Sequence, residues 1–411
     1  MNLSMAKSQI LSLLMFALIW SCTTPSEKQS ESQKDKRLSV RFAKSEMKRF
    51  PEVWMIDWHG KPYWGYTQGV QGKALLDMWR YTEDSIYFNH VLRYADSLVA
   101  DDGSIYTYDS SKYNIDMINA GKILFPIYKE TGDEKYKQAI ELLVEQLDNH
   151  PKTSTGGFWH KKRYPYQMWL DGLYMGSPFL AQYAAEFDQP EYFDVVTTQF
   201  KQIDEHNYSP ETSLYHHAWD ESKSIFWADP ETGLSTNYWG RSLGWLGMAL
   251  VDVLDYLPED HPDRPVLVEM VGKVAKGIEN MQDTESGVWY QVLDQGDREG
   301  NYLEASASVM FVYTLYKAMR KGYIDDSYME VADKGYAGVL KEFLKENEDG
   351  TLTLQKCCAV AGLGPADNPR RDGSFEYYIS EPIIDNDAKA TGAFIWMSME
   401  KEMLENKQES K

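Results

Sequence analysis

Residues 118–160 read INAGKILFPIYKETGDEKYKQAIELLVEQLDNHPKTSTGGFWH, and they contain the unit from which we predict the fold. The outer part, 134–149, places Ile140, Leu143, Val144 and Leu147 at the i, i+3, i+4, i+7 spacing of one buried helix face. A more apolar segment, 118–128, precedes it after a short polar turn, and a Gly-aromatic stretch follows it. The unit therefore predicts an inner helix, a turn, an outer helix and a connecting loop.

This unit recurs along the chain. Further apolar segments lie at 174–185, 245–256 and 305–318, and further amphipathic segments at 89–100, 191–205, 264–280 and 328–345. The markers of the Gly-aromatic stretches are separated by 54, 57, 73 and 63 residues: Gly103, Gly157, Leu214, Gly287 and Gly350. A sixth marker lies at Trp64-Gly65, and segment 391–404 is apolar enough for an inner helix. We therefore predict an all-α (α/α)6 barrel, a closed six-hairpin toroid, as a single domain over residues 38–411.

The first segment has the pattern of an export signal. Lys7 precedes an apolar run over 10–20, and Ser21-Cys22 follow. A basic start, a short apolar region and a small residue before cysteine are typical of a lipoprotein signal, so we expect cleavage after residue 21 and lipid on Cys22. The alternative is an ordinary signal peptide with an incidental cysteine. Residues 22–37 lack large apolar side chains and suggest a flexible tether, so we expect a periplasmic or outer-membrane-associated protein.

The charge balance excludes several classes of function. The chain of 411 residues has 42 Lys+Arg and 63 Asp+Glu, a formal net charge of −21, and loss of Lys7 with the signal would give 41 − 63 = −22. Nucleic-acid binding needs clustered cations, so we expect no nucleic-acid partner. Apart from the Cys22 expected to carry lipid, only Cys357 and Cys358 remain, which predicts packed thiols rather than a disulfide framework.

Three carboxylates occupy corresponding positions in successive repeats. Asp116, Asp171 and Glu304 lie 13, 14 and 17 residues after their Gly markers, at or just before the start of an inner helix. In a toroid such positions face one cavity, although acids near helix N-termini also simply complement the helix dipole. Asp171 follows Met168-Trp-Leu and precedes Gly-Leu-Tyr-Met175, so we expect burial to raise its pKa and to suit it for general acid catalysis.

Basic and aromatic residues lie near these acids in the sequence. His160, Lys161, Lys162 and Arg163 form a run that could receive an anionic substrate or could be a solvated loop. Arg241 lies between Trp239 and Trp245, and His217 is flanked by aromatic residues. Gly240-Arg-Ser242-Leu-Gly244 matches the nucleophile-elbow string but lacks a preceding apolar strand. There is no dinucleotide fingerprint and no HExxH, so we expect neither a cofactor nor a metal.

Several motifs in order resemble glycoside hydrolase family 105, the unsaturated rhamnogalacturonyl hydrolases, related to the family 88 unsaturated glucuronyl hydrolases. The likeness runs over about 54–394. Its signatures are Trp64-Gly-Tyr66, Asp116-Met-Ile-Asn-Ala-Gly121, Phe158-Trp-His160-Lys161, Gln167-Met-Trp-Leu-Asp171, Trp239-Gly-Arg241 with Trp245, Tyr302-Leu-Glu304, and Arg371-Asp-Gly-Ser-Phe-Glu-Tyr-Tyr378.

The resemblance implies an (α/α)6 barrel that hydrates a 4,5-unsaturated uronic acid at the non-reducing end of a lyase-generated pectin-type oligosaccharide. It assigns the proton donor to Asp171 and the second carboxylate to Asp116. Positions that contact the sugar match Tyr66, His160, Lys161, His217, Trp239, Arg241 and Trp245. Two alternatives stay open at this point: a polysaccharide lyase on a similar toroid, and a non-catalytic glycan-binding lipoprotein.

Overall fold

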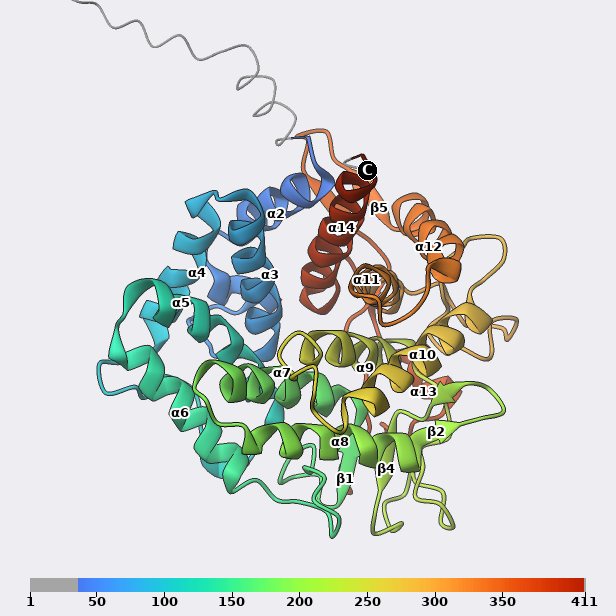
Figure 1. Ribbon diagram of the computed structural model, residues 1–411. Coiled ribbons are helices and arrows are strands. Elements are labelled where there is room, and N and C mark those ends of the chain that lie inside the picture. The colour runs from blue at the N-terminus through green and yellow to red at the C-terminus, as the bar shows by residue number, and fades with distance from the viewer. Residues whose placement is uncertain (1–35, 410–411) are drawn as a thin grey trace, which may run out of the picture.

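The computed structural model describes residues 36–409, and its helices form a closed ring (Figure 1). The six inner elements share a place around the central axis and pack each against the next: α3 (Tyr66–Thr82), η3 (Ile115–Ile123) continued by α5 (Leu124–Thr131), α7 (Leu170–Glu186), α9 (Gly240–Val253), α11 (Ala305–Lys321) and α14 (Ala388–Glu409). Because α14 packs back against α3, the ring is closed. The predicted (α/α)6 barrel is confirmed.

The outer helices pack behind the inner ring, one to each inner element. They are α4 (Ser85–Leu98), α6 (Glu134–Asp148), α8 (Glu191–Asn207), α10 (Arg264–Met281), α12 (Met329–Glu342) and α2 (Leu38–Arg49). The sixth pair joins the two ends of the described chain, because α2 packs on α14. Ser39 fixes this contact, since its amide and hydroxyl donate to the carboxylate of Glu402 at 3.0 and 2.7 Å.

Local chemistry sets the ends of each hairpin. Gly132 adopts a φ of +66° after α5, a left-handed conformation that ends a helix without a Cβ penalty. Asp133 then caps α6, because its carboxylate accepts from the amide of Lys135 at 3.2 Å. The buried face of α6 includes Leu143 and Leu147, and burying each leucine contributes about 1.5–3 kcal/mol.

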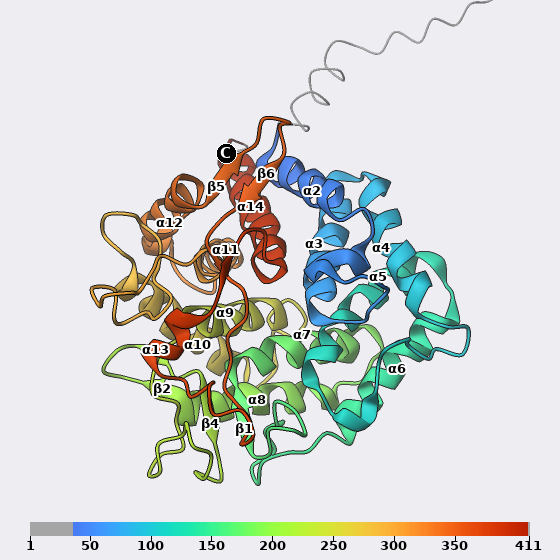
Figure 2. The same ribbon diagram turned by 180° about the vertical axis from the view of Figure 1, so that it is seen from behind.

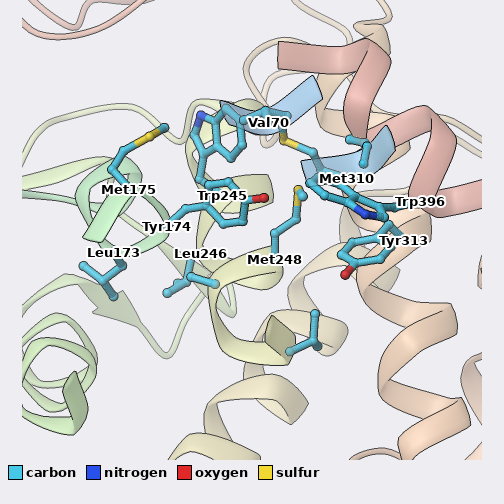
Figure 3. Close-up of a cluster of buried hydrophobic side chains, with 14 of the residues drawn as sticks. Val70, Leu173, Tyr174, Met175, Trp245, Leu246, Met248, Met310, Tyr313 and Trp396 are labelled. Carbon is cyan, nitrogen blue, oxygen red and sulfur yellow. The ribbon is translucent and has the colours of Figure 1, made fainter. Parts of the chain in front are cut away.

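The inner helices are buried on nearly every side because each lies between two inner neighbours and an outer helix. In α11 every residue from position 305 to 319 is buried. Large side chains from these helices meet across the axis of the ring, and Figure 3 shows Tyr174, Trp245, Met248, Met310 and Trp396 among them. The middle of the ring is therefore a packed core and not a pore.

The strands are short antiparallel pairs in the connections. β1 (Gln167–Trp169) pairs with β4 (Ala218–Asp220), β2 (Tyr208–Ser209) with β3 (Leu214–Tyr215), β5 (Leu344–Glu346) with β6 (Leu352–Leu354), and β7 (Cys357–Cys358) with β8 (Ile383–Ile384). Figure 2 shows the chain that leads to the short helix α13 (Phe375–Ser380) passing across the ring toward β1 and β4. The indole N–H of Trp227 donates to the carbonyl of Gly364 at 3.2 Å and ties that chain down.

Two inner helices begin earlier than their apolar patterns indicated, α7 at Leu170 and α9 at Gly240. Their first turns contain Asp171 and Arg241, and these charged side chains interrupt the apolar run. The predicted signal, the lipid-bearing Cys22 and most of the predicted tether lie outside the described residues. Within 36–409, no helix combines the length and the apolar character needed to span a bilayer.

Candidate active site

A cavity of about 170 Å³ lies where the inner helices begin. Its wall includes Asp116, Asp171, Arg241 and Lys389, each the second residue of its inner element, and Tyr66, the first residue of α3. Helix N-termini carry partial positive charge and unpaired amide donors. This end of the ring is therefore suited to hold negative charge. Of the catalytic and sugar-contact residues that the family resemblance implies, all except His217 line this cavity.

Strand pairing places Asp171 beside His217. In the register of β1 with β4, Trp169 lies opposite Ala218, and the amide of Leu170 donates to the carbonyl of His217 at 3.0 Å. Asp171 and His217 are thereby adjacent, with Asp171 Oδ2 and His217 Nε2 3.0 Å apart. Gly172 follows, and a Cβ there would lie 3.2 Å from Nδ1 of His160, so a larger residue would press on that ring.

His217 lies behind Asp171 and not on the cavity wall. Its side chain is fully buried, and its Nδ1 lies 2.8 Å from the hydroxyl of Tyr378. The ring of Trp239 packs 5.0 Å from His217 and 5.8 Å from Tyr378, so the imidazole is enclosed by aromatic groups. A chain of two contacts therefore runs from Tyr378 through His217 to Asp171, and it fixes the orientation of that carboxylate.

The pKa of Asp171 is lowered from its usual value, where the sequence predicted a raised pKa. Burial among Trp and Met does raise the pKa of Asp171, as expected. His217 lowers this pKa through its charge and its hydrogen bond, His160 lowers it through its charge, and together they outweigh burial. The prediction for the free protein was therefore wrong. The reason is that His217 is distant in the sequence and only the β1–β4 pairing brings it into contact.

Asp116 is held by two neighbours from the Gly-aromatic stretch. An isolated bridge pairs Asn114 with Lys161, and the amide of Ile115 donates to the carbonyl of His160. Lys161 Nζ then lies 2.5 Å from one Asp116 oxygen and His160 Nε2 lies 3.5 Å from the other. Burial alone would lower the pKa of Lys161, but Asp116 raises it overall, so the ammonium of Lys161 stays charged.

His160 is a neutral imidazole at neutral pH. Burial lowers its pKa to about 4, and the opposing effect of Asp116 is smaller. Its ring stacks on Trp169 at 4.2 Å with an interplanar angle of 9°. The predicted basic run therefore divides. His160 and Lys161 line the cavity, whereas Lys162 and Arg163 point outward, with Arg163 paired to Asp367 at the exposed surface.

Arg241 lies at the floor of the cavity with only 1% of its surface exposed. One guanidinium nitrogen donates to the carbonyl of Cys358 at 2.5 Å, and the group packs 4.9 Å from the ring of Trp239. Burial would lower the pKa of Arg241, but the nearby Cys358 and Asp387 raise it overall. Trp245 completes the floor and stacks on Tyr174 at 4.8 Å.

Glu304, the third carboxylate at the corresponding position of a repeat, does not reach this cavity. Its side chain is fully buried and caps α11, accepting from the amides of Ser306 and Ala307 at 3.0 and 2.7 Å. It also accepts from the amide of Cys358 at 2.8 Å. The expectation that Glu304 belongs to a rim of three carboxylates was therefore wrong, because its hydrogen-bonding capacity is used inside the fold.

Two cations in the cavity wall were missed as site residues by sequence reasoning. Lys389 is paired with Asp387 at 2.8 Å, and Arg371 comes from the chain that crosses the ring. Lys389 is the second residue of α14, so the repeat phase that identified Asp171 could have found it. With these two, the cavity wall has four cations, Lys161, Arg241, Arg371 and Lys389. They are opposed by Asp116, Asp171 and the Asp387 that pairs with Lys389, so an excess of one positive charge remains.

The remaining sequence motifs belong to the packed interior of the fold and form no catalytic site. Ser242 lies inside α9, and its hydroxyl donates to the carbonyl of Trp239 at 2.8 Å, which is not the geometry of a nucleophile elbow. Cys357 and Cys358 are buried free thiols, as predicted. In the part of the chain that the structure describes, no three His, Cys, Asp or Glu side chains converge as a metal site requires.

Comparison with known proteins gives a consistent result. The family model of Glycosyl Hydrolase Family 88 matches residues 38–405. A solved glycoside hydrolase from family 105 of C. acetobutylicum ATCC 824 is similar at 43% identity and a TM-score of 0.85, over 90% of this chain and 100% of that one. Protein Atu3128 of Agrobacterium fabrum is 37% identical over 56% of this chain and 99% of its own. The unsaturated rhamnogalacturonyl hydrolase YesR of Bacillus subtilis is 26% identical over 71% of this chain and 78% of its own.

Proposed function

Because the chain belongs to Glycosyl Hydrolase Family 88 and is a glycosidase, we propose that it removes a 4,5-unsaturated uronic acid from the non-reducing end of lyase-generated rhamnogalacturonan oligosaccharides. The family-105 resemblance noted in the sequence is confirmed by the 43% identity to a member of that family. The observation that carries the proposal is one cavity in which Asp171 and Asp116 face four cations and three indole rings, those of Trp169, Trp239 and Trp245.

The charge of the cavity supports an acidic sugar as substrate. The protein as a whole carries −21, so long-range attraction cannot bring a uronate to it. The local excess of positive charge and the helix N-termini act at short range, where salt screening is weakest. Arg241, Arg371 and Lys389 are the groups we assign to the uronate carboxylate and neighbouring hydroxyls, and Trp239 and Trp245 are assigned to contact the ring.

Asp171 is the proton donor in this proposal. Its carboxylic acid adds a proton to C4 of the enol ether, the C4=C5 electrons form the new C–H bond, and the ring oxygen stabilises the cation at C5. A substrate carboxylate close to Asp171 raises the pKa of that carboxyl, which opposes the effect of His217 and favours the protonated form in the complex.

Water addition then completes the reaction. The water oxygen bonds to C5 and gives its proton to the carboxylate of Asp171, which restores the acid. The resulting hemiketal opens by cleavage of the bond from C5 to the ring oxygen, which takes up the hydroxyl proton and leaves a ketone at C5. C1 is then a hemiacetal, and it collapses to an aldehyde and releases the aglycone as an alcohol. Asp116, held by Lys161 at 2.5 Å, is placed to accept a hydrogen bond from this water or from a substrate hydroxyl.

We assign His217 and Tyr378 to positioning rather than to sugar contact. If the Tyr378 hydroxyl donates to Nδ1 of His217, Nε2–H is free to donate to Oδ2 of Asp171. The other carboxyl oxygen of Asp171 then points into the cavity in both protonation states. The same arrangement fixes the histidine tautomer, as second partners do in other acid–base sites.

One assay tests the proposal. Purified protein is mixed with oligosaccharides made by a rhamnogalacturonan lyase, and the ultraviolet absorbance of the unsaturated uronate is followed. Loss of absorbance with release of the aglycone is expected. Gain of absorbance on intact polymer would identify a lyase, and binding without any change would identify a glycan-binding protein; either result overturns the proposal. Export and a lipid anchor on Cys22 form a separate part of the proposal, tested below.

A further inference from the structure

A second and larger cavity lies at the other end of the ring. Its volume is about 510 Å³, and its wall comes from all six inner elements, mostly from the second halves of helices such as α3, α9 and α11. We call it the distal cavity. The core in Figure 3 contributes to both walls, with Trp245 in the active-site cavity and Tyr313 and Trp396 in the distal cavity. Trp245, which lines the active-site cavity, stacks on Tyr174, and Lys122 of the distal cavity lies over the ring of the same tyrosine.

The carboxylates of the distal cavity are already neutralised by the protein. Each of the four is matched by its own cation within 2.6–2.8 Å: Asp77 by Lys73, Asp252 by Lys317, Asp255 by Lys321, and Glu400 by Arg320. The hydroxyl of Tyr313 and the indole N–H of Trp396 add hydrogen bonds to Asp252 and Asp77 at 2.6 and 2.9 Å. The acids therefore leave no unbalanced negative charge in the wall.

Two cations in the wall of the distal cavity have no carboxylate of their own in the described part of the chain. Arg80 lies at the exposed mouth, 4.0 Å from an Asp77 that is already paired. Lys122 lies deep in the wall with 2% of its surface exposed, and its Nζ has no hydrogen-bond partner among the described residues. Its Nζ lies over the face of Tyr174, 3.8 Å from the ring centroid. A buried amine without a hydrogen-bond acceptor is costly, so its retention calls for an explanation.

Helix dipoles do not explain Lys122. Cations near helix C-termini complement the partial negative charge there, and this accounts for Lys321 at the end of α11. Lys122 is instead followed directly by α5, so the helical path continues past it. Burial, with Lys73 and Lys317 nearby, lowers its pKa to about 7, although Asp252 and Asp77 oppose this. Its ammonium form therefore lacks full stabilisation within the protein.

We propose that the distal cavity binds a small hydroxylated oxyanion, an acidic sugar or a phosphate ester, with Lys122 as its buried anchoring cation and Arg80 at the mouth. The volume lies in the range of small-molecule sites, about 300–1,000 Å³. Trp396 and Tyr313 offer aromatic surface to the ligand, and the remaining lone pairs of the paired carboxylates accept from its hydroxyls. This site is independent of the hydrolase chemistry assigned to Asp171.

Side-chain NMR of the lysine amines tests the proposal on the whole protein. Lys122 is assigned as the signal lost in Lys122→Met, or in Lys122→Arg if the methionine variant does not fold. Lys161 is assigned in the same way and reports on the active-site cavity. The probes are galacturonate, inorganic phosphate and, as the uncharged control, galactose. A Lys276→Met variant, altered at an exposed site on α10, controls for the effect of substitution itself.

We expect galacturonate or phosphate to raise the pKa of Lys122 by about one unit or more, because an adjacent anion stabilises the ammonium form. Galactose should leave that pKa unchanged. A response to galacturonate alone identifies a sugar acid, and a response to phosphate identifies a phosphate-bearing ligand. The proposal is overturned if no probe moves Lys122, if galactose moves it equally, or if galacturonate moves only Lys161.

Discussion

Asp171 and His217 are 46 residues apart in the chain, yet their carboxylate and imidazole lie 3.0 Å apart at the N-terminus of α7. Tyr378, a further 161 residues along, holds the opposite nitrogen of the same imidazole at 2.8 Å. Asp171 lies in the first turn of α7, His217 between β3 and β4, and Tyr378 in α13, and of the three only Asp171 lines the cavity. The acid–base group of the proposed reaction is therefore oriented from behind by residues that do not line the active-site cavity.

Replacing Asp171 by Asn should abolish most turnover. The amide keeps the shape but has no carboxylic proton to give, so we expect turnover to fall by about 10²-fold or more. Affinity for the oligosaccharide, measured by calorimetry, should remain. Asp349→Asn, at an exposed loop, serves as the control. A turnover near that of the wild type in Asp171→Asn would remove Asp171 from the role of proton donor.

Replacing Tyr378 by Phe should lower kcat by about 5- to 10-fold with little change in KM, because one hydrogen bond that fixes His217 is lost. Without the hydroxyl of Tyr378, His217 is no longer held in one tautomer and lowers the pKa of Asp171 less. The pKa of Asp171 therefore rises, and the alkaline limb of the pH–kcat profile moves to higher pH. The profile is compared with that of Tyr106→Phe, an exposed tyrosine. A loss of melting temperature with an unmoved profile would show that Tyr378 only supports the fold.

Replacing Arg241 by Lys should lower kcat/KM by about 10- to 100-fold. A lysine keeps the charge but loses the planar donors, and a charge-assisted hydrogen bond in a desolvated site contributes about 1.5–3 kcal/mol. Circular dichroism checks that the variant is folded. Arg163→Lys, outside the cavity, should keep full activity. Unaltered kinetics in a folded Arg241→Lys protein would establish a purely structural role, through its bond to Cys358.

Stability should fall in mild acid because of buried neutral histidines. Burial lowers the pKa of His150 to about 4, against about 6.5 in an unfolded chain. The unfolded state therefore binds the extra proton between these values, and the free energy of unfolding decreases by roughly 3 kcal/mol per such group as pH falls from 6.5 to 4. Urea unfolding of His150→Gln should show a flatter pH dependence. Parallel curves for the variant and the wild type would contradict this.

The anchor predicted at Cys22 is tested in cells. Cys22→Ser should leave an unprocessed precursor or release protein from the membrane fraction, because the lipid-bearing thiol is gone. Ser26→Ala, in the predicted tether, is the matched control. An identical membrane fraction for Cys22→Ser and the wild type would show that the cysteine is incidental.

The amino-acid sequence determined the helix pairs and the positions that face the active site. The apolar periodicity of α6 and the turn at Gly132-Asp133 are local, so each is readable without knowing what packs against it. The repeat phase also placed Asp116 and Asp171 at one cavity, because equivalent positions in a closed ring share one end, although it assigned Glu304 to the same place wrongly.

Only the tertiary structure decided what surrounds those positions. It showed that His217 lowers the pKa of Asp171, that Glu304 lies inside the fold, and that Lys389 and Arg371 add positive charge to the cavity. It also paired α2 with α14 and left Lys122 without an acceptor. These properties depend on contacts between residues far apart in the chain, and a pKa or an unpaired charge is set by neighbours in space, which periodicity along the sequence does not encode.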